Sequence, residues 1–404
     1  MIARADHRVI AVTVAAAVAA AMSTVGVAAD WQFNPKVEAG YIYDDNYRLS
    51  EPGAEIDVQG ALLDAQLELL NLTQAGEFSF TPRVRATYFP DERPLDTTDY
   101  FGTLNWEHRG QRVTSGVRAD FAQQDVVNSE QPDAEVNSGL GDPVLGDSGR
   151  VLVRNRRTRA SIAPTVDFEL SARRALQFEA SYADISFDRE IAGAQVGYNA
   201  ADLTASLVSR ITELSSLTTR LRGARYDIDT QGATNSYGAE LQWDTRNAAD
   251  TRKFVRIGAQ NVELIDGGAE TAWLAGAGIS FSLGRNELFA DLARSVGPSA
   301  AGVIVTRDQL RLRWTRAMTP RLSVLAGLRG THDDDVDTGS SFQARSYATG
   351  ELGLQWRWQE EFSLRFAYDY TWQKFADAPS DATSNGATIS FLYQPLQRGR
   401  VRND

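Results

Sequence analysis

The sequence lacks cysteine entirely among its 404 residues. Disulfide frameworks and thiolate chemistry are therefore excluded. Beyond the N-terminal stretch it also lacks an apolar run of the length that a membrane-spanning helix needs, about 20 residues. This absence excludes an α-helical inner-membrane protein. Basic residues are in deficit, since the formal net charge is −12, and this argues against a nucleic-acid partner.

The first residues have the pattern of a secretory signal peptide. Arg4 and Arg8 precede an Ala- and Val-rich run at 9–22, and small residues at 27–29 form a cleavage site. The apolar run is short and rich in small residues, which favours a signal peptide over a membrane anchor. We therefore expect a signal peptide at 1–29, one folded domain at 30–396 and a short polar tail at 397–404.

The stretch 351–375 shows the pattern that organises the rest of the chain. Every second side chain is apolar, and the residues between them are polar, charged or small. A period of two indicates a β-strand, and the polar turn at 359–361 indicates an antiparallel hairpin. The apolar stripe consists of Leu352, Leu354, Trp356 and Trp358 before the turn, and of Phe362, Leu364, Phe366, Tyr368, Tyr370 and Trp372 after it.

The same alternation recurs along the chain, from a first strand at about Val37–Leu49 to a last one at Ala387–Tyr393. It predicts about eighteen strands, within two of that number. The connections alternate between long polar segments and short turns. This asymmetry is typical of outer-membrane barrels, which have short periplasmic turns and longer external loops.

Three features indicate that the apolar stripe faces lipid rather than a protein core. Nearly every strand has the same two-faced character, whereas a soluble β-sandwich has edge strands that must be protected. Aromatic rings lie toward strand ends, as in the girdles at membrane interfaces. The opposite stripe carries arginines at mid-strand, which a dry core tolerates poorly.

The sequence therefore predicts an all-β protein, a closed antiparallel transmembrane β-barrel of about 18 strands in the bacterial outer membrane. A sheet in lipid must close, because an open edge leaves backbone groups unsatisfied. Outer-membrane lipid and lipopolysaccharide are the expected surroundings. A soluble β-sandwich or β-helix is the alternative. If the lumen is occluded, we expect the loop at Ala122–Gly149 to fold inward.

The polar stripe supplies the candidate functional residues. Two interpretations remain open: a structural wall of mutually paired charges, and arginine ladders that guide anionic groups. Carboxylates on the same stripe favour the structural wall of paired charges. The candidate pore-lining residues are Arg83, Arg85, Arg112, Arg118, Arg157, Arg159, Arg220, Arg222, Arg311, Arg313, Arg357 and Arg365.

Catalytic and metal sites are not predicted. The run 332–337 places His332 beside several aspartates in an expected external loop, as an outer-membrane protease would require. His108 falls at an expected periplasmic turn, and the sequence places no second cluster opposite the loop. A solvated acidic loop, one that binds divalent cations together with lipopolysaccharide, is the favoured interpretation. We expect no catalytic residues, no metal and no cofactor, and hence not an enzyme.

The stretches GYIYDDNYRLS at 40–50 and ATISFLY at 387–393 resemble outer-membrane β-barrel (porin-like) proteins associated with exopolysaccharide and exosortase loci. The resemblance implies a role in exopolysaccharide export, with an anionic polysaccharide and periplasmic export components as partners. It assigns no catalytic residues. In one respect the chain departs from outer-membrane barrels, many of which end on an aromatic residue: residues 394–404 extend past Tyr393.

The expected function is accordingly a conduit for exopolysaccharide. A general or anion-leaning diffusion porin is the first alternative. An adhesin or enzyme displayed on the external loops is the second.

Overall fold

The structure is a computed structural model that describes residues 30–129, 155–191, 194–229, 232–247, 251–264, 267–336 and 343–395. The expected signal peptide and polar tail, and most of the expected loop at 122–149, lie outside the described residues.

Strands make up almost all of the described chain. Eighteen are present, together with a short 3₁₀ helix η1 (Arg93–Leu95) and a four-residue helix α2 (Val126–Ser129). The strands are β1 (Asp30–Asp44), β2 (Val58–Leu72), β3 (Gly76–Tyr88), β4 (Thr97–Arg109), β5 (Val113–Asp125), β6 (Arg156–Ser171), β7 (Arg174–Phe187), β8 (Tyr198–Arg210), β9 (Ser215–Ile228), β10 (Gly232–Arg246), β11 (Arg252–Glu263), β12 (Ala269–Leu283), β13 (Asn286–Pro298), β14 (Ile304–Ala317), β15 (Leu322–Asp335), β16 (Arg345–Arg357), β17 (Phe362–Phe375) and β18 (Ala382–Tyr393).

The strands form one closed sheet, in which each strand pairs antiparallel with the next along the chain. The seam is formed by β1, which pairs with β2 on one side and with β18 on the other. Tyr41, for example, lies opposite Ala61 of β2 and Ile389 of β18. Closure leaves no free edge, which is the condition for a sheet to span a bilayer. The predicted closed antiparallel barrel is confirmed.

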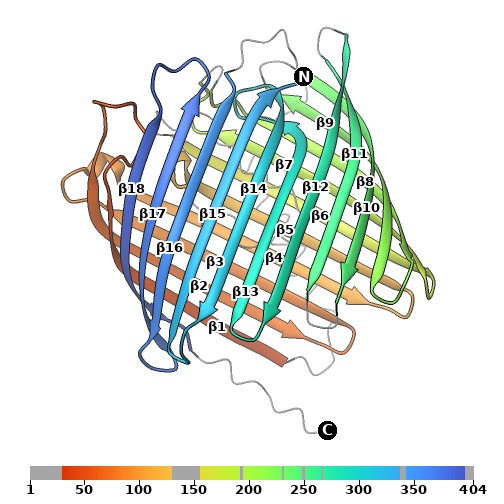
Figure 1. The fold of residues 1–404 in the computed structure, drawn as a ribbon, viewed down its shortest axis with the longest axis horizontal. Helices are drawn as coiled ribbons and strands as arrows, with labels where there is room; N and C mark the ends of the chain where they lie inside the picture. Colours follow the sequence, from red (N-terminus) through yellow and green to blue (C-terminus); the bar gives the residue numbers. More distant parts are fainter. Residues whose placement is uncertain are drawn as a thin grey trace.

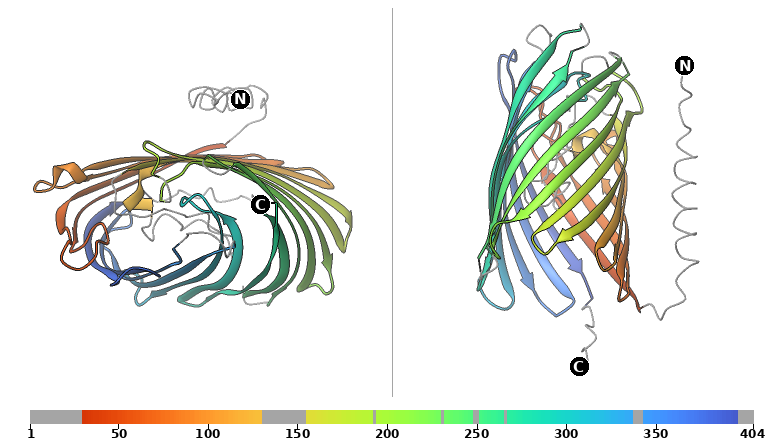
Figure 2. Two further views of the ribbon diagram at one scale, coloured as in Figure 1. Left: turned by 90° about the horizontal axis from the view of Figure 1, so that it is seen from above. Right: turned by 90° about the vertical axis from the view of Figure 1, so that its right-hand side faces the viewer.

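The strands are tilted (Figure 1), and the view from above shows a flattened cross-section with two long walls (Figure 2). β1 starts and β18 finishes at the same end of the barrel. The connection 45–57 lies at the other end, here called the external end. Most connections there are longer than the turns opposite, such as 172–173 and 284–285.

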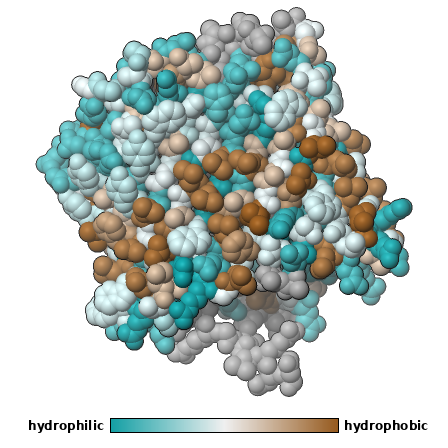
Figure 3. All heavy atoms as spheres, viewed as in Figure 1, coloured by the Kyte–Doolittle hydropathy of each residue, from teal (hydrophilic) through white to brown (hydrophobic). Residues whose placement is uncertain are grey.

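Alternation along each strand divides the side chains between two environments. On β17, Leu364 and Phe366 are 42% and 44% exposed, whereas Ala367 is 6% exposed. The exposed apolar side chains form a band across the middle of the surface shown in Figure 3, with hydrophilic residues above and below it. Soluble monomers rarely expose an apolar surface of this extent, whereas the outer face of a membrane barrel contacts the hydrocarbon of the bilayer through such a band.

No helix in the described part of the chain has the length and apolar character to cross a membrane.

Several strand boundaries at the external end differ from the sequence prediction, and β1 and β10 illustrate this. β1 ends at Asp44, so Leu49 belongs to the following connection, where it has a φ of 51°. Leu49 packs inward against Tyr347 and Ala382. Its position is therefore determined by burial in this cluster and not by the alternation of a strand. The expected long loop at Asp229–Ser236 is instead mostly strand, because β10 already begins at Gly232.

The expected external loop at 332–337 begins within β15. Neighbouring residues therefore point to opposite faces. His332 is exposed on the outer face, where its Nδ1 lies 2.9 Å from the hydroxyl of Ser346. Asp333 is buried in the lumen. The prediction of one acidic loop cluster was wrong, because the strand is longer than the apolar pattern indicated; Asp337 lies outside the described residues.

Candidate functional site: the barrel lumen

The lumen wall is held together by ion pairs between neighbouring strands. Asp64 of β2 accepts hydrogen bonds from Arg83 Nε at 2.8 Å and from Arg85 Nε at 3.0 Å, both on β3. Glu351 of β16 accepts one from Arg365 of β17 at 2.6 Å. Antiparallel register places such residues on the same face of adjacent strands, so the pairs follow from alternation plus register.

The same arrangement continues along both long walls. Arg311 of β14 donates to Asp291 of β13, with Nε and Oδ1 2.8 Å apart. Arg222 of β9 pairs with Asp202 of β8. Arg118 pairs with Asp120 of its own strand at 2.8 Å. Many of the arginines expected to line a pore therefore have a carboxylate partner within the wall.

The remaining predicted arginines differ in their surroundings. Arg220 donates to the amide oxygen of Gln242 at 2.9 Å, and Arg157 and Arg159 lie on the lumen side of β6. Arg112 lies in the turn between β4 and β5, and Arg357 is the last residue of β16, so both are at the end of the barrel opposite the external end. Arg313 makes no ion pair or side-chain hydrogen bond with any described residue.

A dense basic group on β14–β16 was not anticipated from the sequence. Asp333 accepts hydrogen bonds from Arg307 Nε and Nη2 at 2.6 and 2.7 Å, and the charges of Arg345 and Arg329 also act on it. The guanidinium groups of Arg345 and Arg329 lie 5.2 and 5.9 Å from the ring centre of Tyr347. Arg307 lies on β14 in the same phase as Arg311. A predicted strand that began two residues earlier, at Arg307 instead of Gln309, would have identified Arg307 as a lumen residue.

Apolar side chains fill part of the lumen at the external end. The largest cluster gathers where β7–β9, β11 and β14 reach that end, and includes Phe187, Tyr198, Tyr226, Ile228, Val262 and Ile304. The connections 188–197 and 299–303 contribute Val196 and Ala300, and the backbone N–H of Val196 donates to the Ala300 carbonyl at 2.8 Å. Two connections thus meet inside the barrel and reduce its cross-section.

A second apolar cluster lies beside the seam. Tyr47, from the connection 45–57, packs against Phe89 with ring centres 5.2 Å apart, and Val127 of α2 joins them. Burial, together with the nearby charges of Asp125 and Asp99, raises the pKa of the Tyr47 hydroxyl, so it stays neutral. Val126 belongs to the first cluster and Val127 to the second, so α2 links the two.

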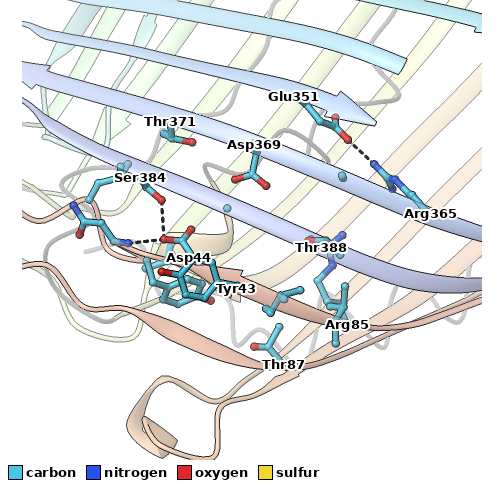
Figure 4. Close-up of a pocket in the computed structure, with 18 of the residues that line it drawn as sticks. Tyr43, Asp44, Arg85, Thr87, Glu351, Arg365, Asp369, Thr371, Ser384 and Thr388 are labelled. Carbon is cyan, nitrogen blue, oxygen red and sulfur yellow. Dashed lines mark hydrogen bonds and ion pairs between the residues drawn. The ribbon is translucent and has the colours of Figure 1, made fainter. Parts of the chain in front are cut away.

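A cavity of about 140 Å³ lies below this second cluster, between β16–β18 and β1–β3. Figure 4 shows side chains from both sides pointing into it. Its charged lining consists of Glu38, Asp44, Arg85, Glu351, Arg365 and Asp369, and hydroxyls and the Tyr347 ring complete it. This site was not predicted from the sequence. Alternation along β1 places Glu38 and Asp44 on the lumen face, since Tyr41 and Tyr43 are exposed on the other face.

Among the described residues, no group of three or more histidine, aspartate or glutamate side chains is arranged to hold a metal ion.

These observations define a class of protein. A closed antiparallel barrel with an even strand number, an apolar outer belt and a charged lumen is an outer-membrane β-barrel of bacteria.

Comparison with known proteins finds similarity to solved structures. The chain matches no protein-family model and no curated protein sequence. It is similar to Pseudomonas aeruginosa OccK2 (OpdF) in complex with glucuronate, at 11% identity over 91% of this chain and 99% of that one, with a TM-score of 0.48. It is similar to Pseudomonas aeruginosa OpdO at 14% identity (91% and 98% covered, TM-score 0.47). It is also similar to Acinetobacter baumannii OccAB1 at 9% identity (91% and 97% covered, TM-score 0.46).

Proposed function

We propose that the protein is a porin-type diffusion channel for small charged solutes, with a stretch of wall on β14–β16 that favours anions. The observation that carries this proposal is a lumen lined by charges of both signs within a closed barrel. Such a wall stays hydrated, so a small polar solute can pass without losing its water. We therefore propose a channel rather than an enzyme.

The packed connections at the external end favour small solutes over a polymer. The link between Val196 and Ala300 and the two apolar clusters occupy space that a passing polysaccharide chain would need. The exopolysaccharide conduit implied by the resemblance of 40–50 and 387–393 therefore has less support than the porin alternative. A loop-displayed enzyme also has less support, since His332 and Asp333 face opposite sides of the sheet.

The proposal is tested with the refolded protein in planar bilayers and in liposomes. We expect stepwise ion conductance, and swelling of liposomes in small sugars and amino acids but not in long polysaccharide. Migration of the unheated protein in gel electrophoresis confirms folding. Folded protein that conducts no ions would reject the channel, and passage of long polysaccharide at the rate of small solutes would restore the export function.

Arg313 provides a test of the anion preference. Its guanidinium has no carboxylate partner among the described residues, so its charge is available to solutes. We expect Arg313→Gln to lower the anion-to-cation permeability ratio by up to about fivefold, because an exposed charge interaction contributes about 0.2–1 kcal/mol. Reversal potentials across a KCl gradient measure this ratio.

The matched control is Arg316→Gln, which removes an exposed arginine from the outer face of the same strand. Its permeability ratio should equal that of the parent protein. An equal shift in both variants would mean that overall charge, and not the lumen wall, sets the preference.

A further inference from the structure

Arginines at the end of the barrel opposite the external end, here called the turn end, differ in whether they have a carboxylate partner. Arg109 pairs with Glu107, and Arg252 pairs with Asp244 at 3.4 Å. Arg316, the next-to-last residue of β14, makes no ion pair or side-chain hydrogen bond with any described residue. Its charge is therefore not neutralised within the described part of the protein.

Arg316 is exposed on the outer face of the barrel, at the lower end of β14 in Figure 1. In the sheet it lies opposite Asn286 of β13 and Val324 of β15. Trp314 and Leu312 precede it on the same face, toward the middle of the apolar band. Arg316 thus lies where the apolar band ends, at the depth where lipid headgroups begin.

Arg285, in the turn between β12 and β13, brings a second guanidinium group close to Arg316. The backbone N–H of Ala317 donates to the Arg285 carbonyl at 2.9 Å, and Arg285 Nη1 donates to the Met318 carbonyl at 3.2 Å. Met318 follows Arg316 by two residues, a separation of about 7 Å along an extended chain. Arg285 has no carboxylate partner among the described residues. Two arginine side chains at this spacing can contact one phosphate group.

Carboxylates are absent from the described outer surface around these two arginines. The turns that join β12 to β13 and β14 to β15 contain none, and those on the outer faces of β14 and β15 are at the external end. Glu287 is close in sequence but faces the lumen, opposite Thr315. Glu360 and Glu361 belong to the turn between β16 and β17, which is two strands away from β14. The charges of both arginines are therefore uncompensated at the depth of the headgroups.

We propose that Arg285 and Arg316 bind the phosphate of an anionic phospholipid in the periplasmic leaflet. Short turns of outer-membrane barrels are periplasmic, which places this site in that leaflet. The planar fork of each guanidinium group matches the oxygens of a phosphate. The acyl chains lie along the apolar band, beginning at Trp314 and Leu312. The site is on the outside of the barrel, so it goes beyond the proposed channel function.

Native mass spectrometry of the refolded protein in a non-ionic detergent measures this binding. Phosphatidylglycerol is titrated, and phosphatidylcholine, whose headgroup has no net charge, is the comparison lipid. We expect the parent protein to retain one phosphatidylglycerol at a lower concentration than phosphatidylcholine. In the double variant Arg285→Gln/Arg316→Gln, the concentration for half occupancy should rise about thirtyfold, because each basic side chain near the membrane surface contributes a factor of about five.

The matched control is Arg109→Gln/Arg252→Gln. It removes the same charge from the turn end, but from arginines that have carboxylate partners. Half occupancy should stay at the parent concentration. The single variant Arg316→Gln should raise it about fivefold, and it tests the site if the double variant does not fold. Heat-modifiable migration confirms folding of each variant.

Three outcomes would overturn the lipid site. The first is equal binding of phosphatidylglycerol by the parent and the double variant. The second is an equal loss in the matched control, which would assign the effect to overall charge. The third is displacement of the lipid by inorganic phosphate at equal concentration, which would show an anion site without lipid contact. None of these results depends on whether the protein conducts ions, so failure of the lipid site and failure of the channel are distinguished.

Discussion

Leu352→Arg is expected to impair insertion of the barrel and to lower its stability in the bilayer by about 2–4 kcal/mol. Leu352 lies on the outer face of β16 and is 60% exposed. On that face it lies between Trp356 toward one end of the strand and Ser346 toward the other. This position is near the middle of the apolar band, where an arginine cannot reach water without distorting the bilayer.

Leu325→Arg is the matched control. Leu325 lies on the adjacent strand β15, opposite Gly353, so its side chain is on the other face of the sheet from Leu352. In the hydrated lumen an arginine keeps its solvation, and folding should be retained. Leu325 pairs with Gly353, the residue next to Leu352. The same substitution should therefore destabilise the barrel at Leu352 and leave it folded at Leu325.

Urea titration of the protein refolded into liposomes, followed by its heat-modifiable migration, measures both effects. A lower midpoint for Leu352→Arg alone confirms the assignment of the faces. Equal midpoints for the two variants would show that the outer face does not meet hydrocarbon.

Asp333→Asn is expected to be the most damaging single change in the lumen. Asp333 is only 4% exposed, and it accepts hydrogen bonds from two nitrogens of Arg307. The charges of Arg345 and Arg329 also act on it. Removal of its negative charge leaves neighbouring guanidinium groups to repel one another, and loss of one partner of a buried pair costs about 3–5 kcal/mol.

Asp334→Asn serves as the control for this change. Asp334 is the next residue along β15 and is exposed on the outer face; Thr306 Oγ contacts its backbone carbonyl, not its carboxylate. Its replacement should leave the free energy of unfolding, obtained from the urea titration, within about 0.5 kcal/mol of the parent value.

A second variant keeps the prediction testable if Asp333→Asn fails to fold. Asp333→Asn combined with Arg307→Gln removes both partners, and it should recover part of the lost stability. A double variant less stable than Asp333→Asn alone would show that the pair does not act as a unit.

Much of the fold was accessible from the sequence because the signal is local. In the stretch 351–375, a period of two defines strands, their apolar face and their turn, and an even number of such strands with no long apolar run points to a closed barrel. The strand number was predicted as about eighteen, and the structure has eighteen. Closure follows from the unsatisfied backbone groups of any open edge in lipid.

The strand boundaries at the external end were less accessible, for a physical reason. There the strands extend beyond the apolar band, so both faces become polar and the alternation fades. His332 and Arg307 lie in such extensions. The sequence pattern therefore assigned His332 to a loop and left Arg307 outside the predicted strand.

The sequence by itself determined which side chains face inward, since strand phase is a property of neighbouring residues. It placed Arg365 on the lumen side, and in the structure the same alternation along β1 puts Asp44 there. Only the tertiary structure decided which of these charges have partners, because pairing depends on the register between strands and on closure at the seam. Arg365 meets Glu351 through a hairpin, but Asp44 meets Ser384 across more than 300 residues of sequence. No pattern of neighbouring residues indicates that long-range contact, because it exists only once the barrel has closed at the seam.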